Sequence, residues 1–156
     1  MDKYLVQVRV LGIMTQEGER EEVETLADGL LRTDGDHFEL AYREIAENEN
    51  EEVKVKILLT KTGIGDEAEC RIMKEGPVRS DMLFLKDSQT ECLYVTPFGE
   101  MLLEVYTYSA EAVEEAGNLS VKLNYRLLSQ GMPLSEAEVF ISAKRKSCPQ
   151  RKSLLQ

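Results

Sequence analysis

Hydrophobic and polar residues alternate along most of this chain with the period of two that half-buried β-strands produce. In the first such segment Tyr4, Val6 and Val8 lie on one face, and Gln7 lies on the other. The same alternation runs through residues 53–59 and 121–127. This pattern is typical of antiparallel sheets that have one face in the core and the other in water.

Turn-forming residues divide the chain into strand-like segments. Asp34-Gly35 is the clearest signal for a two-residue hairpin turn. In the block from Thr96 to Gly99, Pro97 cannot donate to a strand ladder and Gly99 tolerates a positive φ, so the block predicts a strand end and a turn. We predict strands near residues 3–14, 20–32, 36–45, 52–62, 66–74, 78–86, 91–96, 100–109, 118–129 and 137–145.

Residues 109–116 have a different composition, because alanine and glutamate dominate them. Ser109 is a residue type that favours a helix N-cap, although no glutamate follows it at the capping-box position. We therefore predict at most one short helix, of one or two turns, near residues 109–116.

Short strands that follow one another at this spacing predict an all-β, single-domain protein. The expected architecture is one antiparallel meander of about eight to ten strands that closes into a barrel, because closure removes exposed sheet edges. We expect residues 1–145 to form the barrel and residues 146–156 to form a basic, disordered tail. A chain of 156 residues is long enough to bury the core of one such domain.

Charge is distributed unevenly along the chain. The formal net charge is −10, yet residues 144–156 hold five of the 19 basic residues and none of the 29 acidic ones. The rest of the chain is strongly acidic, which argues against binding of nucleic acid through the main body. The basic end has two interpretations: a solubilising terminus, or a segment that contacts an anionic partner.

Several other classes of protein find no support in the sequence. We see no apolar stretch long enough for a membrane helix and no secretory signal, so we expect a cytoplasmic protein. The three cysteines and one histidine are scattered and contain no CxxC, so we expect neither a zinc site nor a cofactor. The one histidine, His37, falls on the solvent side of its strand, and we expect no enzymatic activity.

The strand pattern assigns several aromatic and polar residues to the interior. Tyr94, Thr107 and Tyr125 share the predicted inward face with Met82 and Phe84. A barrel of this size leaves room either for a filled core with hydrogen-bonded tyrosines or for a lumen that holds one small ligand. We treat these residues as candidate ligand-binding residues.

Arg79 is a further candidate with two interpretations. By alternation it lies with Asp81, opposite Met82 and Phe84, which predicts an ion pair on the exterior. Strand registers near the Gly76-Pro77 turn are uncertain, and a shifted register would turn Arg79 inward to bind a ligand carboxylate.

The middle of the chain also carries a combination of motifs. They are Lys74-Glu75-Gly76, the run 79–84 with its Met82-x-Phe84, Tyr94-x-Thr96-Pro97-Phe98-Gly99, Thr107, and Leu123-x-Tyr125-x-Leu127. Together they resemble the YwiB-like family of bacterial proteins, over residues 3 to about 145. The resemblance implies a lipocalin-like (calycin-type) β-barrel in the cytoplasm, with no assigned activity and no catalytic residues.

Two functional hypotheses remain from the sequence. The first is a non-enzymatic protein that binds a small apolar molecule inside the barrel. The second is an interaction module with a filled core, which uses its outer face or acidic surface to bind a protein partner or a second copy. A solvent-reachable interior space would favour the first hypothesis, and a packed interior with an exposed apolar patch would favour the second.

Overall fold

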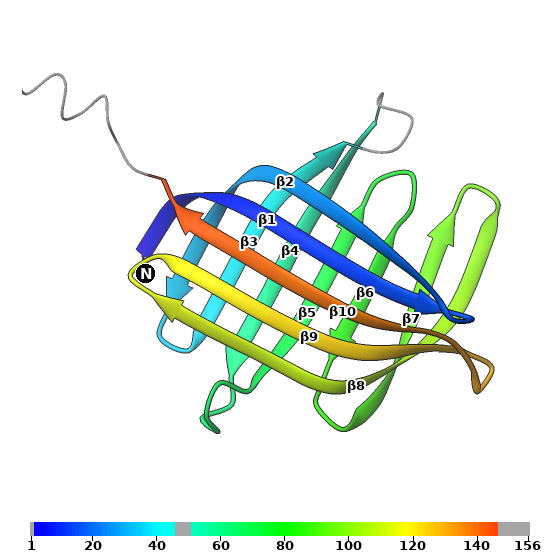
Figure 1. The fold of residues 1–156 in the computed structure, drawn as a ribbon. Coiled ribbons are helices and arrows are strands. Elements are labelled where there is room, and N and C mark those ends of the chain that lie inside the picture. The colour runs from blue at the N-terminus through cyan, green and yellow to red at the C-terminus, as the bar shows by residue number, and fades with distance from the viewer. Residues whose placement is uncertain (1, 46–50, 147–156) are drawn as a thin grey trace, which may run out of the picture.

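The computed structural model describes residues 2–45 and 51–146, and in these residues all regular secondary structure is β-strand (Figure 1). The described part of the chain contains no helix long and apolar enough to cross a membrane. The strands are β1 (Asp2–Gln16), β2 (Glu19–Asp34), β3 (His37–Ile45), β4 (Glu52–Lys61), β5 (Ala68–Glu75), β6 (Ser80–Phe84), β7 (Ser88–Thr96), β8 (Gly99–Glu115), β9 (Asn118–Ser129) and β10 (Met132–Arg145).

The ten strands form one antiparallel sheet in the order β6-β5-β4-β3-β2-β1-β10-β9-β8-β7. β6 and β7 stand at its two ends, and they meet again through two backbone hydrogen bonds of 2.9 Å between Arg79 and Val95. Thr90 Oγ1 also donates to the carbonyl oxygen of Leu83 at 2.6 Å. The sheet therefore curls into a nearly closed barrel, and the predicted all-β meander is confirmed (Figure 1).

The sequence allowed at most one short helix near residues 109–116, and this segment instead forms the second half of β8 and pairs with β9. Ala110 and Ala112 are buried, whereas Glu111 and Val113 between them are exposed. Their period of two is a strand signal that the alanine and glutamate content concealed. Small side chains at the buried positions suit a close approach of β8 to the β4–β5 turn, where Ala112 N–H donates to the Asp66 carbonyl at 2.9 Å.

β2 bends between the two sides of the barrel at Gly29. It pairs with β1 along its whole length, but its pairing with β3 covers only Gly29 to Asp34. A Cβ on Gly29 would lie 2.8 Å from Val8 Cγ2 and 2.9 Å from the Ala41 carbonyl oxygen, closer than real Cβ atoms approach. The absence of a side chain thus allows three strands to meet, and beyond this point β2 and β3 separate.

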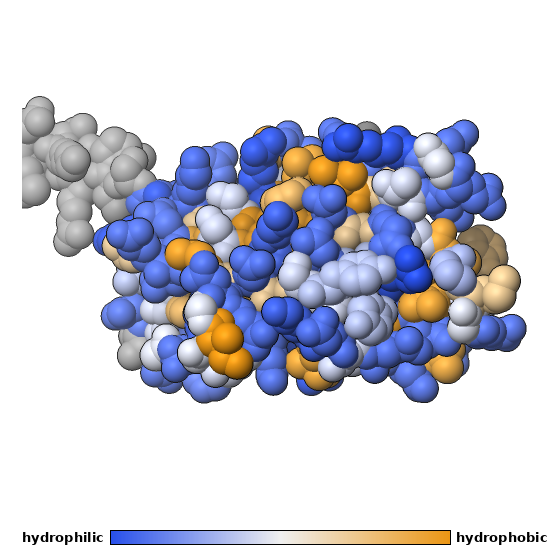
Figure 2. All heavy atoms as spheres, turned by 60° about the horizontal axis from the view of Figure 1, so that its bottom comes forward, coloured by the Kyte–Doolittle hydropathy of each residue, from blue (hydrophilic) through white to orange (hydrophobic). Residues whose placement is uncertain are grey.

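Much of the interior is packed with aliphatic side chains. Leu31, Leu40, Ile57, Leu59 and Leu123 are each no more than 2% exposed. The outward positions are largely polar, and Figure 2 shows hydrophobic surface on one face of the molecule as separate patches among hydrophilic residues. Burial on one face and hydration on the other is the arrangement that the alternating sequence predicts.

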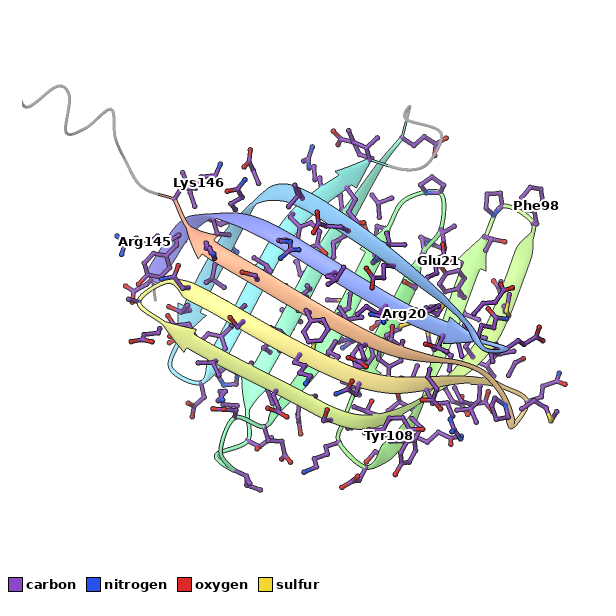
Figure 3. The ribbon with its side chains drawn as sticks, viewed as in Figure 1. Arg20, Glu21, Phe98, Tyr108, Arg145 and Lys146 are labelled. Atoms are coloured by element: carbon purple, nitrogen blue, oxygen red, sulfur yellow. The ribbon has the colours of Figure 1, made fainter. Side chains whose placement is uncertain are left out.

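The turn between β7 and β8 is stabilised by its own side chain. Thr96 Oγ1 accepts the Phe98 N–H at 3.1 Å and donates to the Gly99 carbonyl at 2.9 Å. Gly99 has a φ of 135°, as the sequence predicts, and the Phe98 ring is fully exposed at the tip of the hairpin (Figure 3).

We expect Gly99→Val to lower the free energy of unfolding by about 1–3 kcal/mol, because a β-branched residue is strained at this φ. A Cβ there meets nothing within 4 Å, so the cost comes from the backbone and not from a clash. Urea denaturation of both proteins measures the difference. Equal midpoints would show that the turn relaxes without cost.

Candidate functional site

The structure brings five of the six candidate ligand-binding residues to the interior. Phe84, Thr107 and Tyr125 are buried, and the Phe84 and Tyr125 rings lie 4.8 Å apart between centroids. Met82 and Tyr94 share the inward face but are partly exposed. The five residues therefore belong to one interior surface, which runs from the packed core towards solvent.

Arg79 is not part of this group. Its side chain is exposed, and it falls by alternation on the face opposite Met82. Asp81, its expected partner, is instead held by Arg71, whose Nε and Nη2 donate to the two carboxylate oxygens at 2.8 and 2.6 Å. The Arg71 hydrogen bond lowers the pKa of the Asp81 carboxyl and offsets the effect of its partial burial.

Strand registers place a line of polar residues along the inward face at one end of the barrel. Tyr42 pairs with Val55, which pairs with Lys74, which pairs with Ser80. The Arg79–Val95 bridge then sets Ser80 beside Tyr94. We call these side chains the polar row: Tyr42, Lys74, Ser80 and Tyr94.

The next line of inward residues, one step deeper in the barrel, is apolar. It crosses the same strands. Its members are Leu40, Ile57, Ile72 and Met82, followed by Cys92 and Leu103. We call it the apolar row. Polar groups therefore lie above an apolar floor, which is the arrangement of pockets that bind small molecules.

At this end of the barrel, the inward-facing residues of β1 and β2 are exposed to solvent. Val23 and Met14 continue the inward faces of β2 and β1, yet they are 56% and 36% exposed, and Met101 on β8 is 49% exposed. Inward side chains of the packed half are buried, and Leu123 among them is 0% exposed. We call this end of the barrel, lined by the polar row, the apolar row and the exposed side chains of Met14, Val23 and Met101, the cup.

Two charged residues of the cup, Glu44 and Lys74, lie close to each other. Glu44 continues the inward face of β3, and Lys74 Nζ lies 3.2 Å from its Oε1. This oxygen is buried, and within the described residues it accepts no hydrogen bond of good geometry. Burial and then the charge of Glu44 raise the pKa of the Tyr42 hydroxyl, so the cup holds a neutral phenol beside an ion pair.

Tyr125 and Thr107 form a second polar group near the floor, where they pair across β8 and β9. Burial raises the pKa of Tyr125 to about 12, with smaller contributions from Tyr94 and Cys92. Thr107 Oγ1 is fully buried and has no hydrogen-bond partner among the described residues. Buried polar groups are nearly always satisfied, so a partner-less hydroxyl in this position favours a water or ligand atom as its partner.

The sequence interpretation missed Tyr42, Glu44 and Lys74, although the signal was present. Glu44 continues the alternation of Leu40 and Tyr42, and Lys74 continues that of Ile72. A charged residue in phase with a core-facing series marks the point where a strand leaves the core. That signal was available without the structure.

Other candidate chemistry does not converge on the cup. His37 is exposed, with Nδ1 3.2 Å from Thr60 Oγ1. Within residues 2–45 and 51–146, no group of three or more histidine, cysteine or acidic side chains is placed to hold a metal ion. A groove of about 560 Å³ lies on the outer face of β3, β4 and β5, and charges of both signs line it, from Arg43, Lys54 and Lys56 to Asp28 and Glu75.

Buried thiol and phenol groups make stability sensitive to alkaline pH. Burial raises the pKa of Cys70 from 9.0 to about 12. The unfolded chain therefore releases this proton at a lower pH than the folded chain, and the stabilisation present below pH 9 is lost as the pH rises towards 12.

We expect the free energy of unfolding to fall above pH 9 by up to about 1.4 kcal/mol per pH unit for this group. Cys70→Ala should reduce that slope between pH 9 and 10 without removing it, because burial also raises the pKa of Cys92. Cys148→Ala, in the basic tail, is the control and should keep the slope. Urea denaturation at pH 8, 9 and 10 makes the comparison, and equal slopes in all three proteins would contradict the assignment.

Comparison with known proteins identifies the fold and no activity. A family model described as "Domain of unknown function (DUF1934)" matches residues 8–141. The crystal structure of the ywiB protein from Bacillus subtilis superposes with a TM-score of 0.79 at 17% sequence identity, over 93% of this chain and 94% of that one. The comparison with curated proteins gave no match.

Proposed function

The chain belongs to the DUF1934 family, a domain of unknown function, and we propose from its own site that it binds a small, largely apolar molecule in the cup. The observation that carries this proposal is the exposure of inward-facing apolar side chains. Val23 and Met101 point to the interior and are about half exposed, whereas equivalent positions deeper in the barrel are closed to solvent.

The two rows define the chemistry of the proposed ligand. Its apolar body would lie on Met82 and Ile72, where each square ångström removed from water contributes about 25 cal/mol. Its polar end would lie at Tyr42, Tyr94 and Lys74, whose hydroxyl and ammonium groups donate hydrogen bonds. A molecule with one polar end matches this arrangement better than a uniformly apolar one.

Binding fits the cup better than catalysis. The Lys74 ammonium and the Glu44 carboxylate neutralise each other at 3.2 Å. His37 lies on the outer face of β3, away from the polar row. We therefore propose a carrier or sensor of a small molecule and assign no nucleophile or base.

A pair of substitutions on β2 tests the proposal. Val23 faces the cup and Leu26 faces outward, yet the two are similarly exposed, at 56% and 62%. We expect the neutral fluorescent dye Nile red to bind the parent protein with one site, and Val23→Lys to weaken binding at least about tenfold, or about 1.4 kcal/mol.

Leu26→Lys is the matched control, because it introduces the same charge on the same strand. It should leave the dye affinity unchanged, and both variants should keep the parent's thermal midpoint. The proposal fails if the parent does not bind the dye, or if the two variants weaken binding equally.

A further inference from the structure

The first half of β2 lacks a neighbouring strand on one side. Residues 19–28 pair with β1, whereas β3 pairs with β2 only from Gly29 onward. Within residues 2–45 and 51–146, no other strand pairs with this side. In Figure 1 this part of β2 forms the margin of the layer that contains β1, β10 and β9. We call this side of residues 20–28 the free edge of β2.

The hairpin between β1 and β2 decides which backbone groups lie on the free edge. Its turn has two residues, so Gln16 and Glu19 form a hydrogen-bonded pair at its base. Hydrogen-bond direction alternates along an antiparallel strand, so every second residue from Arg20 onward directs its N–H and C=O groups away from β1. These residues are Arg20, Glu22, Glu24, Leu26 and Asp28. Together they offer backbone donors and acceptors over about 27 Å.

The side chains around the free edge are mostly acidic. Residues 19–28 contain five acidic residues and one basic residue. Exposed ion pairs of 2.6–2.7 Å join three of the acidic residues to cations: Glu22 to Arg20, Glu24 to Arg9 and Asp28 to Lys146. Ion pairs on the surface contribute little stability, so these carboxylates can turn to another cation at little cost. Glu19 and Glu21 add further negative charge. The edge therefore repels a second acidic copy of itself and favours a basic partner.

The two faces of the strand differ beside the free edge. Glu22 and Glu24 point outward, whereas Val23, Thr25 and Ala27 continue the inward face of Leu31. Side chains of paired residues lie on the same face of a sheet, so a strand added here would continue both faces. Its outward residues would meet carboxylates, and its inward residues would meet small or apolar side chains. A strand in which basic and apolar residues alternate is therefore the complement of this edge.

We propose that the free edge of β2 binds an extended segment of another protein, in which basic residues alternate with apolar ones. Main-chain hydrogen bonds supply the attachment, as in other cases of strand addition, and the alternation supplies the specificity. The site ends at Asp28, because Leu30, the next residue of the series, already pairs with Ala41 of β3. This interaction does not depend on the ligand proposed for the cup.

Hydrogen exchange of the full chain, measured amide by amide, tests the proposal. The basic tail predicted over residues 146–156 lies outside the described residues from position 147 on, and the full chain keeps it. The probe is a peptide of about nine residues, blocked at both ends, in which lysine and valine alternate, because this length matches the free edge. Without the peptide, the amides of Glu22, Glu24 and Leu26 should exchange fast, and those of Val23 and Thr25, which face β1, should exchange slowly. A saturating concentration of the peptide should slow the first group at least about tenfold and leave β9 unchanged.

Two further peptides separate alternation from charge. A peptide with glutamate in place of lysine should give no protection. A peptide with all its lysines before all its valines should protect less than the alternating one. Equal protection by the glutamate peptide, or by the peptide with separated blocks, would contradict the proposed recognition.

Variants of β2 place the binding on the free edge. Leu26→Pro removes an N–H that faces away from β1, which edge strands tolerate, so the protein should keep its far-ultraviolet spectrum and lose at least about tenfold in affinity for the alternating peptide. Glu22→Lys with Glu24→Lys keeps every backbone donor and should also weaken binding. Glu111→Lys with Glu138→Lys is the matched control, because both residues are exposed on β8 and β10, away from this edge, and it should bind as the parent does.

Three results would overturn the proposal. Slow exchange of the edge-facing amides in the protein alone would show that the edge is already covered, and protection that grows with protein concentration would assign it to a second copy. Unchanged exchange of these amides in saturating alternating peptide would show that the acidic residues only guard the edge.

Discussion

Gly29→Ala should lower the free energy of unfolding by about 2–3 kcal/mol, one of the largest effects expected from a single methyl group in this protein. The new Cβ would lie 2.8 Å from Val8 Cγ2 and 2.9 Å from the carbonyl oxygen of Ala41. The valine methyl can rotate away, but the carbonyl is part of the β3 backbone. Either β2 moves away from β3 at the corner of the barrel, or the contact stays compressed.

Gly12→Ala is the matched control for this substitution. Gly12 lies in the neighbouring strand, also on the inward face, and the nearest atom to its added Cβ would be the Val23 carbonyl oxygen at 3.9 Å. Alanine restricts the unfolded chain more than glycine does, so this change should be neutral or stabilising by up to about 1 kcal/mol. Urea denaturation of both variants measures the difference, and similar losses at the two positions would contradict the role given to Gly29.

Leu123→Trp should cost about 3 kcal/mol or more, because Leu123 is 0% exposed in the packed half of the barrel. Met101→Trp, in the cup, should cost less than about 1 kcal/mol, since Met101 is 49% exposed and the larger ring has room. The sequence contains no tryptophan, so the fluorescence of the one introduced tryptophan also reports the polarity around that position in each variant.

Both tryptophan variants can be followed by denaturation and by emission wavelength. We expect red-shifted emission from position 101 and blue-shifted emission from position 123 if the latter variant folds. Equal stability of the two variants would mean that the interior is hollow throughout. Equal and severe destabilisation would mean that the cup is as tightly packed as the core.

The period-two pattern was sufficient to predict the class and the strand order of this fold. At residues 109–116 the alternation of Ala110 and Ala112 correctly indicates a strand, but the alanine and glutamate content was given more weight. Amino-acid composition reports the local secondary-structure propensity of a segment, whereas the pairing of β8 with β9 is a tertiary contact that overrides this propensity.

The interior position of Phe84, Thr107 and Tyr125 followed from the same alternation. Their role in ligand binding stays a prediction. Which end of the barrel is open did not follow from the sequence, because it depends on where β2 and β3 separate. The strands last approach each other at Gly29, where an added Cβ would meet Val8 and Ala41, and such an approach is visible only in three dimensions.

Native mass spectrometry of the protein, purified without denaturant or detergent from the cells that naturally make it, tests the central claim most directly. The account predicts a folded chain that carries one small molecule, which is lost in the Val23→Lys variant and kept in the Leu26→Lys variant. Only the bare mass for the parent protein, together with no binding of Nile red, would contradict the claim that the cup is a ligand site.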